Sequence, residues 1–210
     1  MKYSVAYYKA LIFDFDGVVI DSENYKIAAF KSIFDAYPKH IKEIDYYNRK
    51  NRGITRFKKF EYIFENILRL PYNPKTETEL ATRYSQELAK NIDKVPLIKG
   101  VRKFLQNQKM LMFIASSAPE NEIDRIVRLN YIKRYFKKIF AHPISKPQAI
   151  KRILKEERLK PFEACFFGDA PIDLESANNV GVDFIARTEA SSKFPKGTRY
   201  ILSFTELLAL

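Results

Sequence analysis

The chain has 210 residues, 46% of them hydrophobic, and a formal net charge of +12. This composition predicts a folded protein with one good-sized core, or with one core and a small inserted module, and it argues against a disordered chain. No apolar stretch approaches the roughly 20 residues that span a bilayer, and the start MKYSVAYYKA has no signal-peptide pattern. The single cysteine, Cys165, can form no internal disulfide, which fits a reducing compartment. We therefore expect a cytoplasmic protein.

The first predicted strand ends in two aspartates. ALIFDFDGVVID, residues 10–21, is an apolar run that carries Asp14 and Asp16 and then Gly17. Charged side chains are costly to bury, so their place at the end of a core strand points to a chemical role. Residues two apart on a strand point to the same side, which predicts that the two carboxylates act at one site.

A stretch without convincing strands follows. In RFKKFEYIFENIL, residues 56–68, the apolar positions fall at steps of three and four and predict one amphipathic helix. We therefore predict an all-helical cap domain over residues 22–93, inserted into a core domain formed by residues 1–21 and 94–210.

From residue 96 onward, short β-rich runs alternate with helical patterns. The predicted strands are 111–116, 137–141, 164–169, 182–187 and 199–202. The predicted helices are 101–108, 120–130, 146–157 and 171–180. This alternation is typical of an α/β fold with a parallel sheet, to which the first strand also belongs.

Further reactive side chains stand near the ends of these strands. Ser116 and Ser117 close the strand that begins at 111, Asp169 closes the strand that begins at 164 with Asp173 four residues on, and Lys146 precedes a helix. In open α/β sheets, ligands bind beyond the carboxyl ends of the strands. Taken singly, each residue also fits a helix cap, a turn or a surface position, but the combination predicts a site.

The chemistry of this set favours phosphoryl transfer. Carboxylate oxygens are hard ligands that suit Mg²⁺. A carboxylate can also act as a nucleophile, and a second one can serve as general acid and base. A metal ion and Lys146 would offset the negative charge that otherwise repels a phosphate, and the hydroxyl of Ser116 can donate to a phosphoryl oxygen.

These motifs resemble those of the haloacid dehalogenase superfamily. DFDGVVID is similar to its first motif, FIASS to its second, SKP to its third and FFGDAPIDLESANNVG to its fourth. The resemblance covers nearly the whole chain and points to the subgroup of phosphoglycolate phosphatases and β-phosphoglucomutases. It implies a Rossmann-like core with an inserted helical cap.

The resemblance also implies roles for the aspartates. Asp14 would be the nucleophile, and Asp16 the general acid for the leaving alcohol and then the base for water. The main-chain carbonyl of Asp16 would hold Mg²⁺ together with Asp14 and Asp169. Asp173 would support the metal through water or as an outer ligand.

The remaining motif residues would bind the phosphate. The resemblance implies that Ser116, which directly follows the apolar run, contacts the phosphoryl oxygens with Ser117 beside it, and that Lys146 neutralises charge at Asp14. The dehalogenases and the phosphonate-cleaving members lack an aspartate at the position of Asp16. We therefore predict a phosphatase that forms an aspartyl-phosphate intermediate.

A β-phosphoglucomutase-like isomerase is the main alternative. RGITRFKKF resembles a stretch of such caps that approaches the substrate, here with Gly53, Thr55 and Arg56. The mutases carry a histidine shortly after the first motif, where this chain has Lys26, and this difference favours hydrolysis.

The high positive charge raises a second alternative, a non-catalytic protein that binds nucleic acid. The basic residues are spread through mixed segments such as KRILKEERLK rather than gathered in one arm. We expect a small phosphorylated metabolite as the partner, either a phosphosugar or a compound like phosphoglycolate. We expect neither nucleic acid nor membrane binding, and a monomer or weak dimer.

Overall fold

The computed structural model describes residues 3–51 and 53–208. It divides into two compact units, which are described separately below. The sheet unit consists of Met1–Asp21 and Pro96–Leu210, and the helical unit consists of Ser22–Val95.

The sheet unit is built on six parallel strands in the order β3-β2-β1-β4-β5-β6. The strands are β1 (Ala10–Phe13), β2 (Leu111–Pro119), β3 (Lys138–His142), β4 (Ala164–Gly168), β5 (Asp183–Arg187) and β6 (Tyr200–Ile201). All residues of β1 and β4 are buried, as expected of central strands in a sheet that is covered on both faces.

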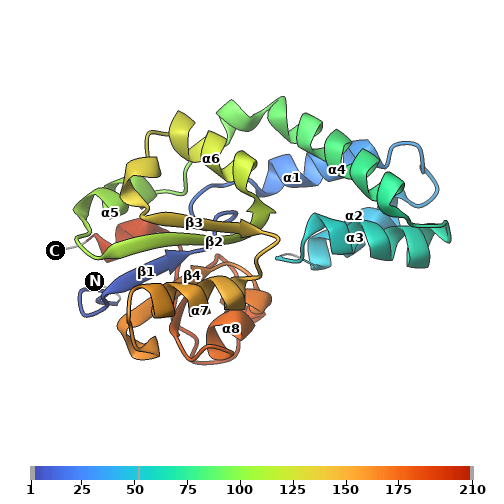
Figure 1. The fold of residues 1–210 in the computed structure, drawn as a ribbon. Coiled ribbons are helices and arrows are strands. Elements are labelled where there is room, and N and C mark those ends of the chain that lie inside the picture. Colours follow the sequence, from blue (N-terminus) through green and yellow to red (C-terminus); the bar gives the residue numbers. More distant parts are fainter. Residues whose placement is uncertain (1–2, 52, 209–210) are drawn as a thin grey trace. The chain divides into compact units, whose positions relative to one another are not determined.

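Helices cover both faces of this sheet (Figure 1). They are α5 (Val101–Asn107), α6 (Glu120–Leu129), α7 (Lys146–Glu156) and α8 (Pro171–Asn178), with short 3₁₀ turns η3 (Lys133–Tyr135), η4 (Pro161–Glu163), η5 (Ser191–Lys193) and η6 (Phe204–Leu207). Figure 1 shows α7 and α8 on one face and α5 and α6 on the other. This arrangement confirms the predicted α/β fold with a parallel sheet.

The strand ends differ from the predicted ones at the residues of interest. β1 stops at Phe13, because the main chain then turns: the amides of Val19 and Ile20 both donate to Phe15 O. Asp14 therefore lies just past the strand, with its amide still donating to Phe167 O, and Asp16 lies at the start of the turn. The argument that placed both residues on one strand was wrong. β2 instead continues to Pro119, with a register shift against β3 after Ala115.

The helical unit contains α1 (Glu23–Ile33), α2 (Ile41–Lys50), α3 (Arg56–Tyr62), the π-helical turn η1 (Ile63–Leu68), α4 (Pro74–Ala89) and the 3₁₀ turn η2 (Ile92–Lys94). It has its own hydrophobic core, in which Phe30, Phe34 and Phe60 pack with ring centroids 5.3 to 6.3 Å apart. Asn73 caps α4 by accepting from the amides of Lys75 and Thr76.

The single amphipathic helix predicted over 56–68 was wrong in its second half. The α-helix ends at Tyr62 and continues as η1, whose wider turn brings Ile63, Phe64 and Ile67 into the core. Leu68, which the α-helical spacing placed on the apolar stripe, is only partly buried.

Among the described residues, no helix combines the length and the apolar composition that a membrane crossing requires.

Candidate active site

The direction in which strands are added reverses between β1 and β4. From β1 the chain adds β2 and β3 on one side, then returns to add β4, β5 and β6 on the other. In such sheets, ligands bind at the carboxyl ends of the strands where the order reverses. Asp14 directly follows β1 and Asp169 directly follows β4, so both predicted metal ligands lie at this point.

An aromatic layer supports the two strand ends. The rings of Phe13 and Phe167 stack with centroids 5.1 Å apart, and both also contact Phe104 and Phe204. The amide of Asp14 donates to Phe167 O at 2.8 Å, so the main chain at Asp14 is fixed to the neighbouring strand.

The Asp14 carboxylate is buried, and each of its oxygens accepts a hydrogen bond. One oxygen, Oδ1, accepts from the amide of Phe15 at 2.7 Å, and the other, Oδ2, accepts from Lys146 Nζ at 2.8 Å. Burial raises the pKa of Asp14 to about 8, with the carboxylates of Asp173, Asp169 and Asp16 adding to the shift and Lys146 opposing it.

Lys146 is a buried cation shared by two carboxylates. It is the first residue of α7, directly after the N-cap Ser145, and its ammonium group donates to both Asp14 and Asp173. Burial acts to lower the pKa of Lys146, but the two carboxylates outweigh it and the net shift is upward. The ammonium group therefore stays charged.

Asp173 holds the start of α8 together. Its carboxylate is fully buried, and Oδ2 accepts from the amides of Asp169 and Ala170, each at 3.1 Å, while Oδ1 accepts from Lys146. A Cβ on Gly168 would lie 2.7 Å from Asp173 Cγ, so a glycine is needed at the end of β4. Asp173 thus fixes both the main chain at Asp169 and the ammonium group of Lys146.

The turn after Asp14 presses against Asp169. Gly17 has φ +75°, and a Cβ there would lie 2.7 Å from Asp169 Cγ. A glycine is required by both the positive φ and the close approach. Asp16, directly before it, is partly buried and bridges to Ile20.

The carboxylates fit a divalent cation. Asp14, Asp169 and Asp173 each offer an oxygen, and these oxygens lie within 4.8 Å of one another. An all-carboxylate donor set matches the preference of Mg²⁺ for oxygen ligands. The oxygens of both Asp14 and Asp173 already accept hydrogen bonds from Lys146 and from main-chain amides, so the division into direct and outer metal ligands stays a prediction.

The two serines lie on the neighbouring strand. Ser116 is buried in β2, and its Oγ accepts from the amide of Ala118 at 3.1 Å, whereas Ser117 is partly buried. The use of Ser116 Oγ as an acceptor leaves its O–H for another partner. Their contacts with a phosphate stay predictions.

The three cap residues named from the sequence lie in the helical unit. Gly53 has φ +78°, and Thr55 caps α3 by accepting from the amide of Lys58. The guanidinium of Arg56 packs over the ring of Tyr84 at 4.4 Å and donates to Ser85 Oγ at 3.0 Å. Tyr84 and Ser85 belong to the same unit as Arg56, and the role of Arg56 in substrate binding stays a prediction.

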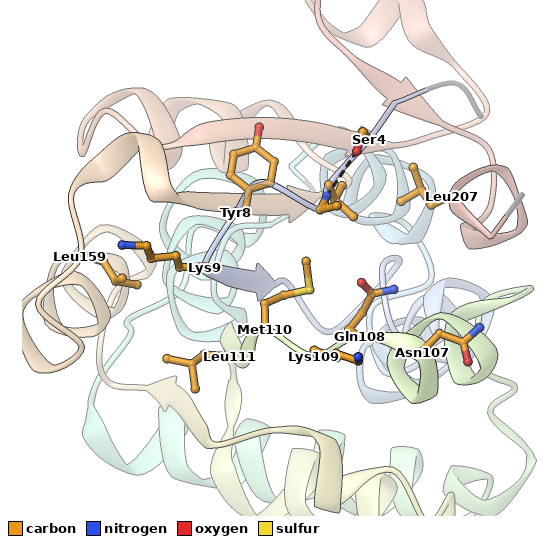
Figure 2. Close-up of a pocket in the computed structure, with 12 residues that line it drawn as sticks. Ser4, Tyr8, Lys9, Asn107, Gln108, Lys109, Met110, Leu111, Leu159 and Leu207 are labelled. Atoms are coloured by element: carbon orange, nitrogen blue, oxygen red, sulfur yellow. Dashed lines mark hydrogen bonds between the residues drawn. The ribbon is translucent and has the colours of Figure 1, made fainter. Parts of the chain in front are cut away.

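A separate cavity of about 680 Å³ lies near the amino ends of the strands, whereas the candidate site lies at their carboxyl ends (Figure 2). Its walls include Lys9 and Leu111, at the amino ends of β1 and β2, together with Tyr8, Met110 and Leu159. None of the residues predicted from the motifs lines it, and we do not assign it to the candidate site.

Sequence reasoning overlooked Arg187, the last residue of β5. Its guanidinium donates to Gly17 O at 3.3 Å, which joins β5 to the turn that carries Asp16. A signal was present, since VDFIAR ends in a charged residue at the carboxyl end of a predicted strand, the feature that identified Asp14 and Asp169.

Comparison with known proteins agrees with this geometry. A family model described as Haloacid dehalogenase-like hydrolase matches residues 11–187. The chain is similar to a phosphorylated carbohydrates phosphatase of Thermotoga maritima, with 24% identity over 84% of this chain and 83% of that protein. It is also similar to a phosphoglycolate phosphatase of Synechococcus elongatus, with 23% identity over 86% of this chain and 84% of that protein.

Among solved structures, a predicted phosphoglycolate phosphatase from Haemophilus somnus has the same fold. It superposes with a TM-score of 0.77 at 14% identity, over 97% of this chain and 98% of that one. The family match spans most of the chain and includes all four motif regions. The chain belongs to the haloacid dehalogenase-like hydrolase family.

Proposed function

We propose that this hydrolase removes the phosphoryl group from a small phosphomonoester, either a phosphosugar or a compound like 2-phosphoglycolate, in a Mg²⁺-dependent reaction. The observation that carries the proposal is the buried Asp14 carboxylate, held by Lys146 next to Asp169 and Asp173 at the switch point of the sheet. The names of the two similar curated proteins support the substrate class.

In the first step, an oxygen of Asp14 attacks phosphorus. The bond between phosphorus and the ester oxygen breaks as the bond to Asp14 forms, and Asp16 donates a proton to the departing alcohol. Proton transfer by a positioned carboxyl group contributes roughly 10²- to 10⁴-fold to such rates. Lys146 and the amide of Phe15, which bind the two oxygens of Asp14, orient its carboxylate for the attack.

In the second step, water attacks the phosphorus of the aspartyl-phosphate. Asp16 takes a proton from that water, the bond to Asp14 breaks, and inorganic phosphate leaves. Ser116 would donate a hydrogen bond to a phosphoryl oxygen in both steps.

Mg²⁺ would be held by Asp14, Asp169 and the main-chain carbonyl of Asp16, with Asp173 behind them. When bound, it supplies positive charge that offsets the charge of the phosphate among four carboxylates.

The proposal is tested with purified protein and a panel of sugar phosphates, nucleotides and 2-phosphoglycolate. We expect phosphate release with Mg²⁺, loss of release with EDTA, and loss in Asp14→Asn, which should keep the wild-type melting temperature within a few degrees. If the wild-type protein releases no phosphate from any compound of the panel, the proposal is wrong.

The mutase alternative predicts a different product. With β-glucose 1-phosphate, a phosphatase gives glucose and free phosphate, whereas a mutase gives glucose 6-phosphate. We expect free phosphate, because Lys26 occupies the position where the resemblance places a histidine in the mutases. The roles of Gly53, Thr55 and Arg56 as substrate contacts are part of this proposal.

A further inference from the structure

Arg187 lies at the same sheet edge as the candidate active site. Gly168 of β4 pairs with Ala186 of β5, so Arg187 is level with Asp169, one residue past the ladder. Only 17% of the Arg187 side chain is exposed.

The three guanidinium nitrogens of Arg187 differ in their contacts. One terminal nitrogen donates to Gly17 O at 3.3 Å, and the other lies 3.7 Å from an oxygen of Glu189, whose side chain is 83% exposed. The third nitrogen, Nε, is buried and has no hydrogen-bond partner in the part of the chain that the structure describes.

The ion pair with Glu189 does not explain why an arginine, rather than an apolar residue, occupies position 187. An ion pair with a well-solvated carboxylate contributes little to stability, and a buried N–H without an acceptor is unfavourable. An apolar side chain would fill the same space without that penalty. The contact with Gly17 O is the one that an apolar side chain could not make.

Such a contact matters at Gly17 because a glycine backbone can adopt more conformations than that of any other residue. A glycine populates positive and negative φ about equally, and this one is held at φ +75° against Asp169. Its N–H donates to Ile20 O at 2.8 Å, and its carbonyl accepts from Arg187. The two hydrogen bonds hold both sides of the residue that directly follows Asp16.

We propose that Arg187 is a positioning residue: by binding Gly17 O it fixes the turn that carries Asp16, and thereby the proton transfer to the leaving alcohol. This inference rests on the function proposed above. A misplacement of about 1 Å at a reacting group can cost on the order of 10²-fold in rate.

The test uses Arg187→Met and two phosphomonoesters that differ in their need for a proton. The leaving group of para-nitrophenyl phosphate departs without one, whereas an alkyl phosphate such as 2-phosphoglycolate, or the alkyl ester of the panel that is hydrolysed fastest, needs one. We expect kcat/KM, which reports the steps up to departure of the alcohol and not the later attack by water, to fall by about 10- to 100-fold with the alkyl ester and much less with para-nitrophenyl phosphate. Arg187→Lys, which keeps the charge and a donor, should recover part of the loss.

Glu189→Gln is the matched control, because it removes the other contact of the same guanidinium and keeps the one to Gly17. Its kcat/KM should equal that of the wild type with both esters. Amide hydrogen exchange in a peptide covering residues 14–20 should be faster in Arg187→Met and unchanged in Glu189→Gln. If Arg187→Met does not fold, the same comparison is made with Arg187→Lys.

An equal loss of kcat/KM with both esters, or unchanged exchange in residues 14–20, would overturn the positioning role. A wild-type protein that hydrolyses neither ester would instead contradict the proposed function and, with it, the proton-transfer part of this inference. The exchange measurement does not depend on turnover and would still decide whether Arg187 holds the turn.

Discussion

Lys146 is buried between the carboxylates of Asp14 and Asp173 and forms an ion pair with each of them. Its helix starts with a well-formed cap: the Ser145 hydroxyl accepts from the amide of Gln148, and the Gln148 side chain accepts from the amide of Ser145. The cap fixes the main chain at Lys146, so the ammonium group is directed inward by the helix start.

Replacing this lysine by methionine should destabilise the metal-free protein strongly. In Lys146→Met, Asp14 and Asp173 stay buried without their cation, and removing one partner of a buried ion pair costs about 3–5 kcal/mol. Urea denaturation in EDTA measures the free energy of unfolding. Lys138→Met is the control, because the Lys138–Glu156 pair is solvent-exposed and should contribute far less to stability. Equal effects of the two substitutions would contradict a structural role for Lys146.

The same variant has a predictable pH dependence. Burial already raises the pKa of Asp14 from 3.8 to about 8, and Lys146 opposes that rise, so its loss raises the pKa further. A group whose pKa is higher in the folded than in the unfolded state stabilises the fold below its unfolded pKa, and this effect is lost as the pH rises through the folded value. The destabilisation by Lys146→Met should therefore be larger at pH 8.5 than at pH 5. A loss of unfolding free energy in Lys146→Met that is larger at pH 5 than at pH 8.5 would contradict this account of the Asp14 pKa.

At the scale of elements, the turn between β1 and α1 determines how the acidic residues meet. Gly17 lies in this turn, and a side chain on it would collide with the Asp169 carboxylate. The turn after β1 and the residue after β4 are therefore packed too closely for any residue but glycine. At the end of β4, a side chain on Gly168 would likewise collide with Asp173.

Gly17→Ala should therefore impair metal use as well as stability. Its Cβ must displace the Asp169 carboxylate, and we expect the Mg²⁺ concentration for half-maximal activity to rise by about 10- to 100-fold, the range seen when groups that orient metal ligands are changed. The matched control is Gly197→Ala, which has a similar positive φ of +93° but no atom within 4 Å of the added Cβ. Both variants should lose stability from backbone strain. If Gly197→Ala raised the Mg²⁺ requirement as much as Gly17→Ala, the steric account would be wrong.

At the scale of the whole molecule, the sequence predicted the parallel sheet because each strand is short, β-rich and separated from the next by a helical pattern. It also located the residues that follow β1 and β4, since aspartate directly after an apolar run is a local signal. The burial of Lys146 had no local signal: a lysine before a helix is usually exposed, and only the packing of β1, α7 and α8 against one another encloses it.

The local hydrophobic pattern also could not predict the π-helical turn η1. Steps of three and four fit an uninterrupted α-helix over 56–68, and the choice of a wider turn depends on how Ile63, Phe64 and Ile67 fill the core of the helical unit. The same limit applies to Arg187, whose contact with Gly17 joins residues 170 positions apart in the chain.

The central claim is that Asp14 takes up the phosphoryl group, and the most direct test is to find that group on it. The wild-type protein is mixed with its best substrate and Mg²⁺, quenched in acid within milliseconds, digested, and examined by mass spectrometry. We predict one phosphoryl group on Asp14, in the peptide that contains residues 10–21, and none in Asp14→Asn. A phosphoryl group on another residue, or turnover in Asp14→Asn at the wild-type rate, would contradict the account.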